Sequence, residues 1–187
     1  MARMDALSDC ADLRESARHW RDGRIKQAVT ARCLAWRQEF PDLFGVGEYL
    51  PLPLEGSAAD RAIVFARRSK NATAITIAPH LAASLLGSAG DIVIPALAWG
   101  DTRFRLPACA LSSCQNILTG AEIVASDGCV PLRVVLAELP VALMIAPASD
   151  ARTIRPETFH GVQQGVRMTQ TTTMSALGIS AFVKGFG

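Results

Sequence analysis

The sequence predicts a mainly β fold preceded by N-terminal helices, with an antiparallel, β-sandwich-like domain as its largest part. Apolar residues recur at intervals of three and four between residues 23 and 40, which is the period of an amphipathic helix. From Gly45 to about residue 148, short alternating stretches are separated by turn residues, as in antiparallel sheets rather than βαβ units. The predicted organisation is helices over residues 1–44, a β domain over 45–148 and a poorly ordered tail over 149–187.

Two helices are expected in the N-terminal region. Residues 5–20 mix apolar positions with charges and indicate a short helix. The second helix spans about residues 23–40; Asp22 is a suitable N-cap, and Pro41 ends the helix because a residue before proline is pushed out of the α region. One face of this second helix carries an apolar stripe, formed by Ile25, Val29, Cys33, Trp36 and Phe40.

The β region begins with a segment, residues 48–54, that alternates but contains Pro51 and Pro53. Prolines of this kind are typical of an edge strand. Residues 61–68 and 73–78 predict a hairpin around 69–72, and residues 79–86 a short helix. Further short strands are expected at residues 92–94, 102–106, 116–118, 122–125, 132–136 and 141–145.

Composition and charge exclude several classes of protein. The 187 residues carry a formal charge of +2, which gives no electrostatic reason to expect a nucleic-acid partner. Half of the residues are hydrophobic, so a folded core is expected. The apolar run of residues 139–148 is too short to span a bilayer, and no secretory signal is visible. Five cysteines without a C-x-x-C pair favour a reducing, cytoplasmic location.

We identify no catalytic residue and no metal or cofactor site in the sequence. The carboxylates that could serve a glycosidase are spread thinly, at Glu48, Glu55, Asp91, Asp101 and Glu122. The three cysteines at 109, 114 and 129 lack a fourth metal ligand and are better interpreted as small buried side chains. The segment Gly45-Val-Gly47 lacks the third glycine of a dinucleotide-binding loop.

The most distinctive motif of the β region is Trp99-Gly-Asp-Thr102. Its Gly-Asp pair suits a turn in which Asp101 accepts hydrogen bonds from backbone amides. Trp99 has two interpretations. It can pack into the core, with its indole N–H seeking an acceptor, or it can stack on a sugar ring as a substrate-binding residue.

Six segments, in sequence order, resemble the malto-oligosyltrehalose synthase family, bacterial and archaeal members of the α-amylase superfamily. They are Trp20-Arg-Asp-Gly-Arg-Ile-Lys-Gln27, Phe40-Pro-Asp-Leu-Phe44, Gly47-Glu-Tyr-Leu-Pro-Leu52, Phe65-Ala-Arg67, Trp99-Gly-Asp-Thr102 with Leu106-Pro107, and Leu139-Pro-Val-Ala-Leu143. The resemblance covers about residues 18–146. The segment after about residue 148 has no recognised counterpart in the family.

The resemblance implies an enzyme that rearranges the reducing end of a maltodextrin into a trehalosyl end by intramolecular transglycosylation. It also implies that the helix over 23–40 is the last helix of a catalytic barrel and that the β domain follows it. None of the family's catalytic carboxylate motifs has a counterpart here. The expectation is therefore a C-terminal domain or fragment that is inactive alone.

The expected partners follow from the apolar stripe and from the resemblance. Burying a large apolar side chain contributes roughly 1.5–3 kcal/mol, so the stripe should not remain in water. We expect it to contact a barrel domain, to fold back onto the β sheet, or to pair with a second copy. Two alternatives to the domain hypothesis stay open: a stand-alone maltodextrin-binding module using Trp99 or Trp36, and an enzyme using cysteine chemistry.

Overall fold

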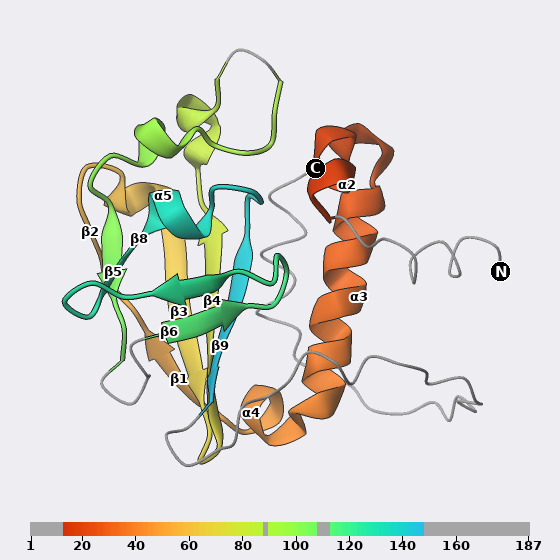
Figure 1. Cartoon of the computed structure of the whole chain (residues 1–187), viewed down its shortest axis with the longest axis vertical. Coiled ribbons are helices and arrows are strands. Elements are labelled where there is room, and N and C mark those ends of the chain that lie inside the picture. The colour runs from red at the N-terminus through yellow and green to blue at the C-terminus, as the bar shows by residue number, and fades with distance from the viewer. Residues whose placement is uncertain (1–12, 88–89, 108–112, 148–187) are drawn as a thin grey trace, which may run out of the picture. The chain divides into compact units, whose positions relative to one another are not determined.

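The structure is a computed structural model that describes residues 13–87, 90–107 and 113–147 (Figure 1). The chain divides into two units, Met1–Ala151 and Arg152–Gly187, and every described residue belongs to the first. It is mainly antiparallel β sheet with a few N-terminal helices, as the sequence predicted. The predicted tail over 149–187 lies outside the described residues. None of the described helices is long and apolar enough to cross a bilayer.

From residue 13 onward, the N-terminal region forms four helical segments where two helices were expected. They are α2 (Leu13–Arg18), the 3₁₀ turn η1 (Trp20–Asp22), α3 (Arg24–Glu39) and α4 (Pro41–Gly45). The N-cap of α3 is Gly23, with a left-handed φ of 80°, and not Asp22 as predicted. The Asp22 carboxylate, one residue before the observed N-cap, still accepts the Arg24 backbone N–H at 2.8 Å. Pro41 ends α3 and then occupies the first turn of α4, where its missing N–H costs nothing.

Six strands form one sheet, in the order β1-β3-β4-β9-β6-β7, and all neighbouring pairs are antiparallel. Their bounds are β1 (Glu48–Pro51), β3 (Ala62–Arg68), β4 (Ala72–Pro79), β6 (Ser113–Asn116), β7 (Glu122–Val124) and β9 (Ala142–Pro147). The predicted hairpin is β3–β4, closed where the Ser69 N–H donates to the Ala72 carbonyl at 2.9 Å. The proline-containing strand β1 lies at a sheet edge, as predicted.

Three short strands form a second antiparallel sheet, in the order β2-β5-β8. They are β2 (Leu54–Glu55), β5 (Arg103–Arg105) and β8 (Cys129–Pro131). One hydrophobic core joins the two sheets, because Ile75 and Met144 of the larger sheet share it with Phe104 and Val130 of the smaller one. The molecule therefore contains the sandwich-like pair of sheets that the sequence predicted.

Two predicted strands are absent from the described residues at their expected places. Residues 92–94 pair with no strand, although Ile92 and Ile94 are buried. The segment expected as a strand at 132–136 is the helix α5 (Leu132–Val135), in which the Leu136 N–H donates to the Leu132 carbonyl at 2.9 Å. The connections between strands also contain three short 3₁₀ segments. They are η2 (Ala59–Arg61), η3 (Ala82–Leu85) and η4 (Ala96–Trp99).

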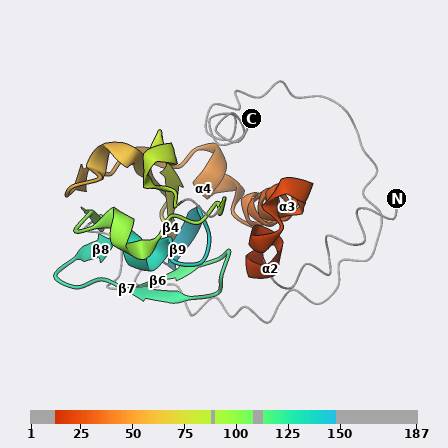
Figure 2. The same cartoon turned by 90° about the horizontal axis from the view of Figure 1, so that it is seen from above.

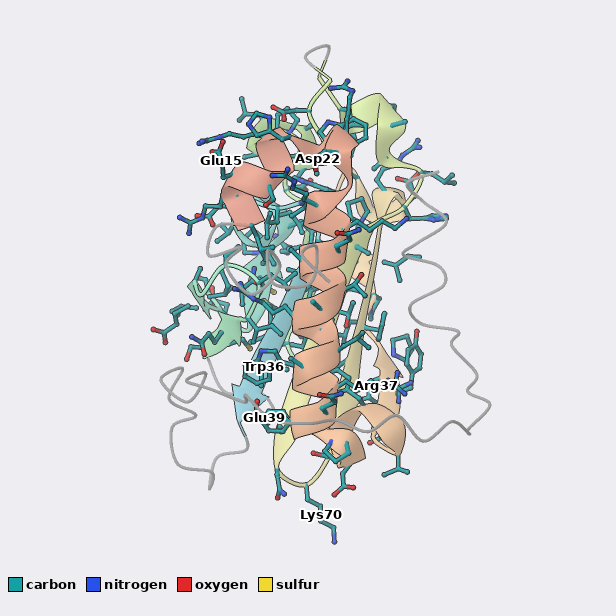
Figure 3. All side chains as sticks on the ribbon, turned by 90° about the vertical axis from the view of Figure 1, so that its right-hand side faces the viewer. Glu15, Asp22, Trp36, Arg37, Glu39 and Lys70 are labelled. Atoms are coloured by element: carbon teal, nitrogen blue, oxygen red, sulfur yellow. The ribbon has the colours of Figure 1, made fainter. Side chains whose placement is uncertain are left out.

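The larger sheet is covered on both faces near its centre. Ile75 and its partner Met144 face the shared core, so the next pair along the strands, Ala74 and Ile145, faces the other way. Those two side chains are also buried, and α3 runs across this second face in front of β4 and β9 (Figures 2 and 3). The Arg32 guanidinium anchors the helix by donating to the Leu118 carbonyl at 2.8 Å.

The apolar stripe of α3 is largely buried within the chain. Ile25, Val29 and Trp36 are buried, together with Ala28, while Cys33 and Phe40 are half-buried. Trp36 and Phe40 stack with ring centroids 5.3 Å apart and planes 7° apart. The helix therefore shields the middle strands of the larger sheet from water.

Candidate functional site

The Trp99-Gly-Asp-Thr102 motif fastens one loop to another. The Asp101 carboxylate accepts the Ser57 backbone N–H at 2.9 Å, and the Thr102 hydroxyl accepts the Ala58 backbone N–H at 2.9 Å. Thr102 is fully buried. A Cβ on Gly56, whose φ is +111°, would lie 2.6 Å from the Thr102 Cα. The backbones of residues 56 and 102 can therefore approach this closely only because residue 56 has no side chain. The motif thus holds residues 56–58 against the start of β5.

Asp101 has a lowered pKa, because the backbone N–H of Ser57 stabilises its ionised form. The side chain itself is exposed. A carboxylate held in this way stays charged and is poorly suited to donate a proton at neutral pH. Its position as a hydrogen-bond acceptor in a turn agrees with the turn role predicted from the sequence.

Trp99, the predicted substrate-binding candidate, lies in the shared core with 0% of its surface exposed. Its indole Nε1 has no hydrogen-bond partner among the residues that the structure describes. A sugar could reach this ring only after η4 moved away from the core. The role of Trp99 in sugar binding stays a prediction. Trp36, the second stacking candidate, is 7% exposed and lies on the buried side of α3, where it stacks on Phe40.

The candidate carboxylates are held apart by separate partners. Glu48 pairs with Arg68 across the β1–β3 edge, and the Glu55 carboxylate lies 3.5 Å from the Arg103 guanidinium across β2–β5. Asp91 and Glu122 are exposed, the second of them on β7. Among the described residues, no three His, Cys, Asp or Glu side chains gather closely enough to hold a metal ion. Of the five candidate carboxylates, Glu48 and Glu55 are thus paired with arginines of neighbouring strands rather than with each other.

Burial makes two of the described cysteines poor nucleophiles. It raises the pKa of the Cys33 thiol, on α3, to about 11 and that of the Cys114 thiol, on β6, to about 11. Both side chains therefore stay protonated at neutral pH, and the thiolate is the reactive form. Cys129 is a third free thiol, and Cys10 and Cys109 lie outside the described residues.

A cavity of about 350 Å³ opens at the N-terminal helices and is lined by Arg18, His19, Trp20, Arg21 and Asp22. Its polar side chains are engaged within the chain. Glu15 contacts both Arg18, at 2.6 Å, and His19, at 3.2 Å. The Trp20 indole donates to the Gly90 carbonyl at 2.9 Å, and the Arg21 guanidinium lies 4.7 Å from the centre of the Trp20 ring. The lining is thus occupied with holding α2 and η1 in place.

An exposed aromatic pair on β1 and β3 was not predicted. The rings of Tyr49 and Phe65 lie 5.2 Å apart between centroids, with planes tilted by 35°. Tyr49 is 55% exposed, and Phe65 is half-buried. The sequence does place Tyr49 on an edge strand, but whether a helix covers that strand depends on where α3 lies in space.

Comparison with known proteins finds one relevant likeness among solved structures. No protein-family model matches the sequence, and no curated protein matches it either. The solved structure of a single-substitution mutant of maltooligosyltrehalose synthase from Arthrobacter ramosus matches with 30% identity and a TM-score of 0.50. The match covers 67% of this chain and 14% of that chain. This chain is therefore similar to a small part of a much longer maltooligosyltrehalose synthase.

Proposed function

We propose that this chain is the non-catalytic C-terminal β domain, or a fragment containing it, of an enzyme like malto-oligosyltrehalose synthase. Such an enzyme converts the reducing end of a maltodextrin into a trehalosyl end. The observation that carries the proposal is the asymmetry of the structural match, which spans two-thirds of this chain but about a seventh of its neighbour. The six sequence segments that resemble the same family support it independently.

The absence of catalytic activity in this part of the enzyme is supported by the positions of the acids. Glycoside chemistry uses two carboxyl groups on either side of one bond. In the described residues, the acids that sequence analysis considered lie on different elements, and three of them are tied to Arg68, Arg103 and the Ser57 backbone. The chain in this proposal stabilises a barrel rather than cleaving sugar.

The proposed partner is the catalytic barrel. The stripe Ile25, Val29, Cys33, Trp36 and Phe40 was expected to meet that barrel or a second copy of this chain. Because most of this stripe lies on the buried side of α3, either contact through it requires α3 to leave the sheet. The opposite side of α3, where Leu34 is 44% exposed, is free to meet a barrel while α3 stays in place.

An assay of the purified chain with maltopentaose tests the proposed lack of catalysis. Proton NMR resolves the anomeric signal of an α,α-1,1 bond from that of the reducing end. We expect no conversion by this chain, while the Arthrobacter ramosus enzyme serves as the positive control. Formation of the trehalosyl isomer by the chain alone would contradict the proposal.

A further inference from the structure

The outward face of strands β1 and β3 is apolar where an exposed face should be polar. Leu50 and Ala66, which pair across the two strands, pack against the shared core. The alternating residues therefore point away from the core. They are Arg67 and four apolar residues, Tyr49, Pro51, Ile63 and Phe65; we call these four the Tyr49 strip. An antiparallel sheet with one solvated face normally places polar side chains there.

The Tyr49 strip is exposed because α3 stops short of it. The helix crosses β4 and β9, where Ala74 and Ile145 are buried, but Tyr49 is 55% exposed and Ile63 is 45% exposed. Both belong to the two strands at one edge of the sheet. A cluster of exposed apolar side chains on a rigid sheet marks a surface that another molecule covers.

The size of the strip argues for a small ligand. A stable protein interface engages about 20–30 residues on each side. Four side chains are too few for that, whereas one or two aromatic rings are enough to hold a sugar. One face of a pyranose ring consists of C–H groups, which are attracted to the negative face of an aromatic ring.

The Arg67 guanidinium provides polar donors on the same face as the Tyr49 and Phe65 rings. Arg67 is the cross-strand partner of Tyr49, so the two side chains lie on the same face. Its Nη1 donates to the Gly47 carbonyl at 3.4 Å, which uses one of the five N–H donors of a guanidinium. The remaining donors suit the hydroxyl groups at the rim of a sugar ring. The tilt of 35° between the Tyr49 and Phe65 rings suits a curved chain better than a flat one.

We propose that the Tyr49 strip, with Arg67, is a surface site for an α-1,4-linked glucose chain. The ligand class rests on the proposed function, because a domain of an enzyme that acts on maltodextrin meets such chains constantly. Two aromatic rings and one arginine give weak binding, which suits a surface that holds a long substrate near a catalytic barrel. Trp99 and Trp36, which the sequence suggested for this role, have no exposed ring face in the structure.

Tyr49 is the single tyrosine of the chain, so it reports on its own site. Protein labelled with ¹³C in the tyrosine ring gives one set of ring signals. We expect these signals to shift saturably with maltoheptaose, with a Kd of about 1–10 mM. Cellohexaose, whose β-1,4 chain is straighter, should shift them less. Ring signals that do not move with maltoheptaose over this range would overturn the proposal.

Two variants and a matched control identify the binding surface. Tyr49→Ala should weaken maltoheptaose binding, followed by saturation-transfer NMR on the sugar, by at least about tenfold. Tyr49→Phe should retain binding, because it keeps the ring. Val124→Ala alters a residue that is 66% exposed on β7, at the other edge of the sheet, and should leave binding unchanged. Circular dichroism confirms that each variant is folded.

The outcomes separate this site from the proposed function. Maltoheptaose binding that survives Tyr49→Ala would overturn the Tyr49 strip and leave the proposed function standing. Turnover of maltopentaose by the chain alone would contradict the non-catalytic role but would not affect a sugar response at Tyr49.

Discussion

Gly56 and Gly100 allow two loops to meet at the Trp99 motif. Gly100 has a φ of +53°, and a Cβ there would lie 2.6 Å from the Ser57 hydroxyl oxygen. Gly56 approaches the Thr102 backbone equally closely. With these contacts, the hydrogen bonds of Asp101 and Thr102 close the junction between residues 56–58 and the start of β5. The motif that most suggested ligand contact in the sequence is explained by this junction.

Replacement of Gly56 by alanine tests how tightly the loops meet. Gly56→Ala should lower the free energy of unfolding by more than about 2 kcal/mol, because a left-handed φ and a backbone clash both oppose a side chain. Gly120→Ala is the matched control, with a φ of +79° and nothing within 4 Å of the added Cβ. It should cost about 1 kcal/mol, from strain alone. Urea denaturation that gives equal losses would contradict the close approach.

Asp101 gives a pH-dependent prediction. Because its folded-state pKa lies below the ordinary value of 3.8, its contribution to stability is complete above that value and is lost as pH falls through the folded pKa. Asp101→Asn should therefore be less stable than the parent at pH 7. The difference between the two proteins should shrink as the pH falls below about 4. Thermal denaturation from pH 7 to pH 2.5 measures this, and a constant difference would contradict the role of the charge.

Helix α3 is the element that decides which surfaces of the larger sheet remain open. Its buried residues Ile25, Val29 and Trp36 recur on one side of the helix, and Leu34 lies on the opposite side. The helix covers β4 and β9 with the first side and leaves the β1–β3 edge to solvent. Helix α3 can be recognised from the sequence, but the exposed surface that its position leaves on β1 and β3 cannot.

Two substitutions that each introduce aspartate into α3 test this packing. Val29→Asp places a carboxylate between α3 and the sheet and should lower the free energy of unfolding by about 3–5 kcal/mol. Leu34→Asp changes a residue that is 44% exposed on the same helix and loses more helix propensity than Val29→Asp, because leucine is the better helix former. It should cost within about 1 kcal/mol. Similar losses in urea denaturation would show that α3 does not lie on the sheet through Val29.

The sequence predicted a helix or strand correctly where its local pattern and its tertiary contacts favour the same structure. Helix α3 has the correct apolar period and a proline at its end, and the β3–β4 hairpin alternates around a short turn. It was insufficient for α5, because Val134 and Val135 favour a strand by intrinsic propensity. The burial of Leu132, Val135 and Leu136 has helical spacing, and those contacts outweigh the propensity. The fold of the core was therefore more predictable than its short connecting elements.

The candidate site was less predictable than the fold for a physical reason. Tyr49 and Phe65 are 16 positions apart in the sequence and become neighbours only through the register of β1 against β3. Their exposure also depends on α3 crossing other strands. Trp99 was the natural candidate in sequence, because its exposure could not be known before the fold. An indole in a Gly-Asp turn can lie in the core, as it does here.

At the scale of the whole molecule, two sheets in the described residues share a core, and helix α3 runs alongside the larger sheet (Figure 1). The structural likeness to a maltooligosyltrehalose synthase covers 67% of this chain and 14% of that enzyme's chain. The proposed role, a support for a separate catalytic barrel, rests on this partial match.

Domain replacement in the Arthrobacter ramosus enzyme tests this account most directly. The segment that matches this chain is exchanged for residues 13–147, and synthase activity is measured with maltopentaose by proton NMR. Deletion of the segment is the control and should abolish activity, because the barrel loses its support. We predict that the replacement keeps at least about a tenth of the parental kcat/KM, a loss of about 1.4 kcal/mol in transition-state stabilisation. A folded replacement that is as inactive as the deletion would contradict the account.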